Sequence, residues 1–202
     1  MNYLAVDTSG KNLTLVIQKD NIIKEFYDGD CGVNHSVNLM PEIEKLLSSV
    51  DYDLATSDFF VSVVGPGSFT GIRIGVSAVK AFALAFNKPV LSITSFDTIA
   101  YNVKSGKRLA IIDAKHNCYY VCGYDGDKVV IQPTFVSKEE VLKYQGEYQF
   151  YAFENLLGLG EVKVVCVVEG LKEAIKAKAN NLIDAESLTP LYIRKSQAEE
   201  GR

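Results

Sequence analysis

The chain has 202 residues and a formal net charge of −4, with 21 Lys and Arg residues against 25 Asp and Glu residues. It contains no long run of Lys or Arg, so we expect neither autonomous binding of nucleic acid nor attachment to a membrane surface. Apolar residues make up 48% of the chain, which is enough to support a core in one large domain or two small ones.

The N-terminal stretch, residues 1–12, is too polar for a secretion signal. No uninterrupted apolar run approaches the roughly 18 residues of a membrane span, so we expect no membrane segment. The four cysteines include no CxxC pair, which favours reduced thiols over a disulfide framework. These features indicate a cytoplasmic protein.

The first half of the chain reads as an antiparallel meander followed by alternating helices and strands. Three apolar runs predict the strands of the meander, namely Tyr3–Asp7, Leu13–Gln18 and Ile22–Tyr27. Helical spacing and breaker residues then predict a helix from Asn34 or Ser36 to about Val50 that bends at Pro41, strands Phe59–Val64 and Pro89–Ile93, and a short helix from Ser95. This alternation indicates parallel crossovers onto one edge of the meander.

The second half begins again with strands and continues with α/β units. The predicted elements are strands Arg108–Asp113, Tyr119–Tyr124 and Val129–Gln132, a helix that Ser137 caps, strands Tyr148–Ala152 and Val162–Val167, and a helix over Glu169–Asn180. The predicted fold class is therefore α/β with two similar halves. We place the halves at residues 1–104 and 105–195, and expect a disordered tail at 196–202.

The stretch Val64–Asn87 is the most informative part of the chain. A turn at Gly65–Gly67 precedes Ser68 and Thr70, either of which can cap a helix. From Ile72 to Phe86 the only charged residues are Arg73 and Lys80. A helix that is apolar nearly all round must be covered on more than one side. We infer that one side lies on the protein's own sheet and that the other packs, with a neighbouring helix, against a second polypeptide.

Small residues recur along the same helix at helical spacing. Ser77, Ala81 and Ala85 form one row, and Gly71 and Gly75 begin a second. Rows of small side chains allow another helix to approach closely. This spacing supports the inference that the helix is used for association.

Candidates for phosphate chemistry are few. The loop Gly65–Gly71 lacks the Lys-Ser/Thr ending of a P-loop and the third glycine of GxGxxG, so it reads as a turn that sets a helix. The turn Asp7-Thr8-Ser9-Gly10 is a better candidate for holding phosphate, although an Asx-turn that closes a hairpin explains it equally well.

Hydrolytic and metal chemistry find less support. Ser68 lacks the flanking glycines of a GxSxG elbow, and only His35 and His116 exist to act as bases. Cys118 and Cys122 could approach His116, but strand alternation makes them ordinary core thiols, and we expect no metal site. The many tyrosines read as strand-face packing, because stacking platforms for RNA need an electropositive groove.

The segment GPGSFTGIRIGVSAVKAFALAF, residues 65–86, resembles the signature segment of the TsaB (YeaZ) family of bacterial tRNA threonylcarbamoyladenosine biosynthesis. Other segments match the family in the same order from residue 4 to residue 195; these are LAVDTS, HSVNLMPEIEKLL, PVLSITSFDTIA, DAKHNCYY and PLYIRK. The resemblance implies a two-domain actin/Hsp70-like (ASKHA, ribonuclease H-like) fold. It also implies a non-catalytic role beside a catalytic relative, TsaD, and recruitment of the ATPase TsaE.

The resemblance also implies where partners bind. In the family, the helices that match Phe69–Phe86 and His35–Leu47 form the face for TsaD, and the same face forms homodimers when the protein is alone. The implied interface residues are Phe69, Ile72, Arg73, Val76, Val79, Lys80, Ala83, His35, Leu39, Met40, Ile43 and Leu47. Asp7, Thr8 and Ser9 are candidates for a vestigial nucleotide contact, with ATP or ADP expected only at a junction with partner subunits.

Two rival functions remain open from the sequence. The first is a small-molecule kinase or phosphotransferase of the actin-like fold, in which Asp7 and Thr8 handle phosphate. The second is a peptidase that uses Ser68. The family's catalytic member carries a pair of metal-binding histidines at helical spacing, and the two histidines of this chain do not match that pair.

Overall fold

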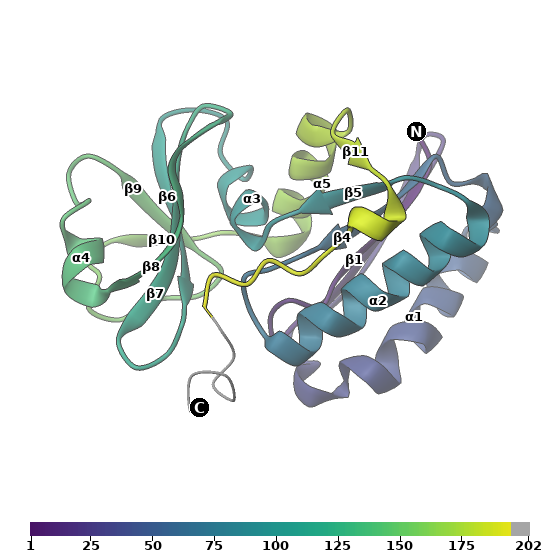
Figure 1. Ribbon diagram of the computed structural model, residues 1–202, viewed down its shortest axis with the longest axis horizontal. Coiled ribbons are helices and arrows are strands. Elements are labelled where there is room, and N and C mark those ends of the chain that lie inside the picture. The colour runs from purple at the N-terminus through teal and green to yellow at the C-terminus, as the bar shows by residue number, and fades with distance from the viewer. Residues whose placement is uncertain (195–202) are drawn as a thin grey trace. The chain divides into compact units, whose positions relative to one another are not determined.

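The computed structural model describes residues 1–194 and divides into two compact units, each shown in Figure 1. The first unit comprises residues 1–94 and 175–191. The second comprises residues 95–174 and continues from residue 192. The boundary lies near residue 94 rather than at the predicted 104/105, and the chain returns to the first unit after residue 174. The predicted tail, 196–202, lies outside the described residues.

The first unit is built on a six-stranded sheet with the order β11-β5-β4-β1-β2-β3. Its strands are β1 (Tyr3–Asp7), β2 (Leu13–Lys19), β3 (Ile22–Asp28), β4 (Phe59–Val63), β5 (Val90–Ile93) and β11 (Leu182–Ile183). β1, β2 and β3 form the predicted antiparallel meander, and β4 and β5 extend it in parallel from β1. The predicted meander and crossovers are thus confirmed.

Two helices lie side by side on one face of this sheet, α1 (His35–Ser49) and α2 (Phe69–Phe86) (Figure 1). Apolar side chains from both helices and from β1, β2 and β4 form a single buried cluster beneath them. Pro41 lies inside α1, which continues through it as one helix, so no fresh helix starts there. Short 3-10 turns at η1 (Gly32–Asn34) and η2 (Leu54–Thr56) flank α1.

The C-terminal part of the first unit is a strap that the sequence patterns did not predict. It consists of β11, the 3-10 turn η3 (Ala185–Ser187) and the residues up to Leu191. The ammonium group of Lys80 on α2 donates to the carbonyl oxygens of Glu186 at 2.8 Å and Leu188 at 3.4 Å. The backbone N–H of Leu191 donates to the carbonyl of Val64 at 2.8 Å. The strap therefore covers one flank of α2.

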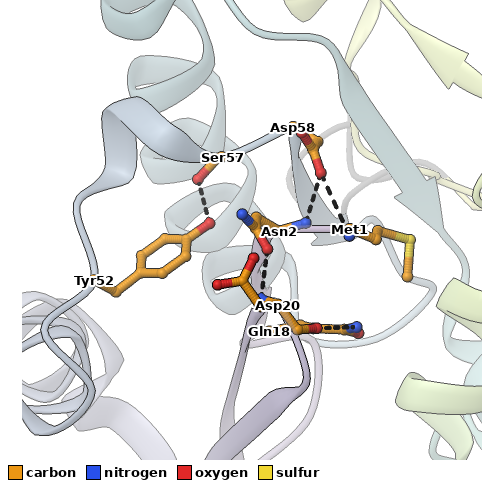
Figure 2. A network of polar contacts seen from close by, with 7 residues as sticks. All are labelled: Met1, Asn2, Gln18, Asp20, Tyr52, Ser57 and Asp58. Carbon is orange, nitrogen blue, oxygen red and sulfur yellow. Dashed lines mark hydrogen bonds and ion pairs between the residues drawn. The ribbon is translucent and has the colours of Figure 1, made fainter.

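A polar network fixes the N-terminal end of β1, as Figure 2 shows. The Asp58 carboxylate accepts from the N–H of Asn2 at 2.7 Å and lies 3.8 Å from the chain's amino group. The N–H of Asp20 donates to the Asn2 side chain at 2.7 Å. Nearby, the hydroxyl groups of Tyr52 and Ser57 form a buried hydrogen bond of 2.8 Å. These contacts join β1 to the β2–β3 turn and to the start of β4.

The second unit is a five-stranded sheet with the order β10-β9-β6-β7-β8. Its strands are β6 (Lys107–Asp113), β7 (Cys118–Asp125), β8 (Lys128–Ser137), β9 (Gln149–Ala152) and β10 (Val162–Val164). Separate apolar clusters cover its two faces, one including α3 (Ser95–Ala100) and the other α4 (Lys138–Leu142). α5 (Val167–Lys178) follows β10, and its residues are divided between the two units.

Buried polar contacts explain why α3 belongs to the second unit. The Arg108 guanidinium on β6 donates to the carbonyl of Ala100 at 2.7 Å and also bonds the carbonyl of Val103. The hydroxyl of Tyr124 on β7 donates to the Asp97 carboxylate at 3.0 Å. Arg108 lies 8 residues after Ala100 and Tyr124 lies 27 residues after Asp97, both on strands outside α3, so the pattern within α3 could not reveal these contacts.

Candidate partner-binding face

Helix α2 presents one of its two rows of small residues to the interior. Of the two capping candidates in the sequence, Ser68 and Thr70, it is Ser68 that caps the first turn, accepting from the N–H of Gly71 at 3.2 Å. A Cβ added to Gly71 would collide with the carbonyl oxygen of Thr8, and one added to Gly75 would collide with the Thr8 hydroxyl. The glycine row therefore permits close approach, but to the turn after β1 and not to another helix.

The second row of small residues lies on the exposed side of α2. Ser77, Ala81 and Ala85 are all exposed, and Leu84 beside them has 52% of its surface accessible. Residues four apart lie on the same side of a helix. This row is therefore a continuous, shallow and nearly uncharged strip along the outside of α2.

Helix α1 adds larger apolar side chains next to this strip. Val37 is 68% exposed, Met40 is 50% exposed, and Pro41 is also exposed. A groove of about 470 Å³ lies along α1 and reaches α2 at one residue; it is lined by Met40, Pro41, Ile43, Glu44, Leu47, Ser48, Leu54 and Phe82. The α1/α2 face is defined here as Val37, Met40, Pro41, Arg73, Ser77, Ala81, Leu84 and Ala85.

Charged side chains lie on and beside the α1/α2 face, and the exposed Glu44 lines the groove. Arg73 is exposed near the start of α2, and its guanidinium lies 5.1 Å from the ring centroid of Phe69. On α1, Lys45 forms a surface ion pair of 2.6 Å with Glu42. An apolar centre with charges at the edge is the usual anatomy of a protein–protein interface.

Seven of the expected interface residues lie instead in the core of the first unit. They are Ile72, Val76, Val79 and Ala83 of α2 and His35, Leu39 and Ile43 of α1. Their side chains are covered by the chain's own packing, apart from the small part of Ile43 that lines the groove, so they lie beneath the face and not on it. The most apolar stripe of each helix is taken by the sheet, because burial of the largest apolar area favours that orientation.

The other expected residues are more accessible. Met40 and Arg73 are exposed, and Phe69 and Leu47 are half-buried. Lys80 is also half-buried and binds the strap. The α1/α2 face also contains six exposed residues outside the expected set, namely Val37, Pro41, Ser77, Ala81, Leu84 and Ala85. The small-residue spacing was the available signal for the three residues of the exposed row.

The turn Asp7-Thr8-Ser9 is closed by the chain itself. All three side chains are buried. The N–H and the hydroxyl of Ser9 both donate to the Asp7 carboxylate, at 2.8 and 2.7 Å. A Cβ at Gly67 would collide with the carbonyl oxygen of Ser9, which also accepts from the N–H of Ser68 at 2.7 Å. The space in which a phosphate could approach this turn is therefore filled by residues 67–68.

Burial also sets the ionisation of this turn. Removal from water raises the pKa of Asp7 above 3.8, and the hydrogen bonds from Ser9 and the nearby His35 only partly oppose that effect. His35 itself, through Nε2, is 2.9 Å from the carbonyl oxygen of Asn12. Within residues 1–194, no three His, Cys, Asp or Glu side chains gather in a way that could hold a metal ion.

By length and composition alone, α2 is long and apolar enough to span a membrane, with a mean hydropathy of 1.5 over its 18 residues. This differs from the expectation that no apolar stretch approaches that length. The helix packs one side into the core described above, as the core helices of globular proteins also do. Its apolar composition therefore follows from having one side in the core and an exposed side made of small residues.

Comparison with known proteins places these features in a family. A family model described as "TsaD: tRNA N6-adenosine threonylcarbamoyltransferase" matches residues 29–165. The tRNA threonylcarbamoyladenosine biosynthesis protein TsaB from Bacillus subtilis is 36% identical over 124 residues, and TsaB from Escherichia coli is 27% identical over 132 residues. The chain belongs to this family, as a TsaB (YeaZ)-type member.

The TsaB-type assignment agrees with the fold. YeaZ from Pseudomonas aeruginosa superposes with a TM-score of 0.80 at 20% identity, covering 95% of this chain and 99% of that one. EutJ from Carboxydothermus hydrogenoformans gives a TM-score of 0.50, covering 86% and 88%. The predicted actin-like α/β fold is thus confirmed. In sequence, the chain spans about half the length of the curated relatives it matches, 53% and 57% for the two TsaB proteins above.

Proposed function

We propose that this chain is a non-catalytic subunit in the biosynthesis of threonylcarbamoyladenosine in tRNA, and that its α1/α2 face binds a TsaD-type catalytic subunit. The observation that carries the proposal is the exposed strip of α2. Ser77, Ala81 and Ala85 permit a partner helix to approach closely, and Leu84 offers an apolar anchor beside them.

The chemistry of the chain supports a role without catalysis. In the turn that would handle phosphate in a kinase, the Asp7 carboxylate is buried and accepts from the Ser9 hydroxyl, and the buried Thr8 hydroxyl donates to the carbonyl of Gly71. Ser68, the candidate nucleophile of a peptidase, serves as a helix cap, and His35 is bonded to a backbone carbonyl. Neither rival function therefore gains support from the positions of its proposed residues.

Further parts of the proposal follow from the family. The assembly recruits a TsaE-type ATPase, and ATP or ADP binds only at a junction between subunits, so the isolated chain has no cofactor. Alone, the chain forms a homodimer through the same face. It acts in the cytoplasm and depends on its partners for contact with tRNA.

The deciding experiment is co-purification and titration with the TsaD-type protein of the same organism. We expect wild type to form a complex, and Leu84→Asp to weaken it at least about tenfold because a charge would be buried in an apolar contact. Lys128→Asp, on the exposed β8 edge of the second unit, is the control. Normal binding by a folded Leu84→Asp variant would remove the face from the proposal.

A second measurement separates the subunit from the kinase. Calorimetry of the isolated chain with Mg-ATP is expected to show no binding, and the chain alone is expected to form no modified tRNA. If the isolated chain bound ATP with micromolar affinity and turned it over, the proposal would be wrong and the phosphotransferase function would take its place.

A further inference from the structure

The turn between β1 and β2, residues 7–12, contacts the starts of both helices that form the α1/α2 face. It will be called the hub turn. It contributes nothing to the face itself, since Asp7, Thr8, Ser9 and Asn12 are all buried. Its contacts nevertheless run in two directions, one to α2 and one to α1.

The contact with α2 is a close backbone approach. The Thr8 hydroxyl donates to the carbonyl oxygen of Gly71 at 2.7 Å, and the carbonyl of Ser9 accepts from the N–H of Ser68 at 2.7 Å. Only glycine fits at positions 67, 71 and 75 because a Cβ at each would meet Ser9 or Thr8. The hub turn therefore determines the height of the first turns of α2 above the sheet.

The contact with α1 uses the other end of the hub turn. The ring of His35, the first residue of α1, places Nε2 2.9 Å from the carbonyl oxygen of Asn12. Just before α1, the N–H of Gly32 donates to the carbonyl of Lys11 at 2.9 Å. The start of α1 therefore contacts Lys11 and Asn12, which follow Thr8 by three and four residues. Thr8 itself is bonded to α2.

The hub turn is closed from inside, because the Asp7 carboxylate accepts two hydrogen bonds from Ser9. Farther along the helices, buried apolar side chains of α1 and α2 belong to one core cluster, and a groove of about 470 Å³ opens along α1 and reaches α2 only at Phe82. The shared core therefore holds the middle of both helices, while the hub turn holds both N-terminal ends.

We infer that the hub turn sets the spacing between α1 and α2, and that Thr8 and His35 are positioning residues for partner binding although neither reaches the face. The inference rests on the proposed function for its binding readout. It predicts that a change on the α2 side of the turn loosens the start of α1, and that a change on the α1 side loosens the start of α2.

The first test is hydrogen exchange of the full chain, which needs no partner. Thr8→Val removes the hydroxyl at nearly constant volume, and we expect faster amide exchange at the starts of both helices, residues 35–40 and 69–75. His35→Leu is expected to do the same. The control is Ser57→Ala, which removes the buried hydrogen bond to Tyr52 in the same unit and should leave both segments unchanged. Loosening of α2 alone by Thr8→Val would overturn the inference.

The second test is the affinity for the TsaD-type partner. We expect Thr8→Val to raise Kd about tenfold, Thr8→Ser to restore it because the hydroxyl returns, and Ser57→Ala to bind as wild type. The Thr8→Val and His35→Leu effects should be non-additive, since both act through one turn. If wild type fails to bind, the proposed function fails while the exchange test still decides the inference. If Thr8→Val does not fold, His35→Leu takes its place in both tests. His35→Gln is then the conservative variant with which His35→Leu is compared, and the pair decides the inference.

Discussion

Val79 and Leu84 stand five residues apart on α2 and have opposite environments. Val79 is fully buried, whereas Leu84 is 52% exposed. Five residues correspond to a rotation of about 140° on an α-helix, so the two side chains point to nearly opposite sides. α2 is therefore a two-sided helix, with one side in the core and one side exposed, although its sequence is apolar on both.

The first prediction concerns the buried side of α2. Val79→Asp should destabilise the fold by about 3–5 kcal/mol, because it places an unpaired charge in the core. Urea denaturation measures the loss of unfolding free energy. Ser77→Asp, on the exposed side of the same helix, is the control and should cost less than about 1 kcal/mol. Equal stability of Val79→Asp and wild type would contradict the burial described here.

The second prediction tests the small-residue row by bulk instead of charge. Ala81→Trp should weaken association with the TsaD-type partner at least about tenfold, because a large ring would hold two helices apart at their point of closest approach. Its unfolding free energy should change by no more than about 0.5 kcal/mol, since the position is exposed. Ala177→Trp makes the same substitution at an exposed site of α5 and should bind normally. Unchanged affinity of Ala81→Trp would exclude close helix approach at this row.

Local sequence signals were sufficient for most elements of the fold. The caps at Ser68 and Ser137 were predicted from residue type and spacing, and both side chains accept the expected helix N–H. The two-residue strand β11 was missed because it is too short to show a period. α3 was assigned to the wrong half, because the contacts of Asp97 and Ala100 come from strands later in the chain.

The candidate site shows a different limit. The sequence indicated that α2 has two covered sides, but not which apolar stripe lies on the sheet. Ile72, Val76 and Val79 form the larger stripe and are buried, whereas the exposed side consists mainly of Ala and Ser. Large apolar residues at helical spacing therefore identify the core more readily than the interface. Small residues at the same spacing were the better indicator of the exposed side.

The third prediction concerns pH. Because burial raises the pKa of Asp7 above 3.8, the folded state holds a proton there that the unfolded chain releases earlier. The stabilisation from this proton is complete below pH 3.8 and is lost as pH rises through the folded-state pKa. Asp7→Asn keeps an oxygen that accepts from Ser9 and removes the ionisation. We therefore expect the stability of wild type relative to Asp7→Asn to fall as pH rises above 3.8.

Paired urea titrations of wild type and Asp7→Asn at successive pH values measure this difference. Asp30→Asn, at an exposed position, is the control and should show no such trend. A difference that stays constant from pH 4 to pH 8, or that rises with pH, would contradict a raised pKa at Asp7.

The fourth prediction assigns Lys80 to the fold rather than to the partner. Lys80→Met keeps the apolar stem and removes the ammonium that holds the carbonyls of Glu186 and Leu188. We expect a loss of about 1 kcal/mol in unfolding free energy and faster proteolysis within residues 184–191, because the strap loses its bonds to α2. Lys45→Met removes a surface lysine of α1 whose ion pair with Glu42 contributes little, and its strap should resist protease as in wild type. If Lys80→Met leaves the strap equally resistant but abolishes partner binding, then Lys80 acts at the interface and the assignment to the fold is wrong.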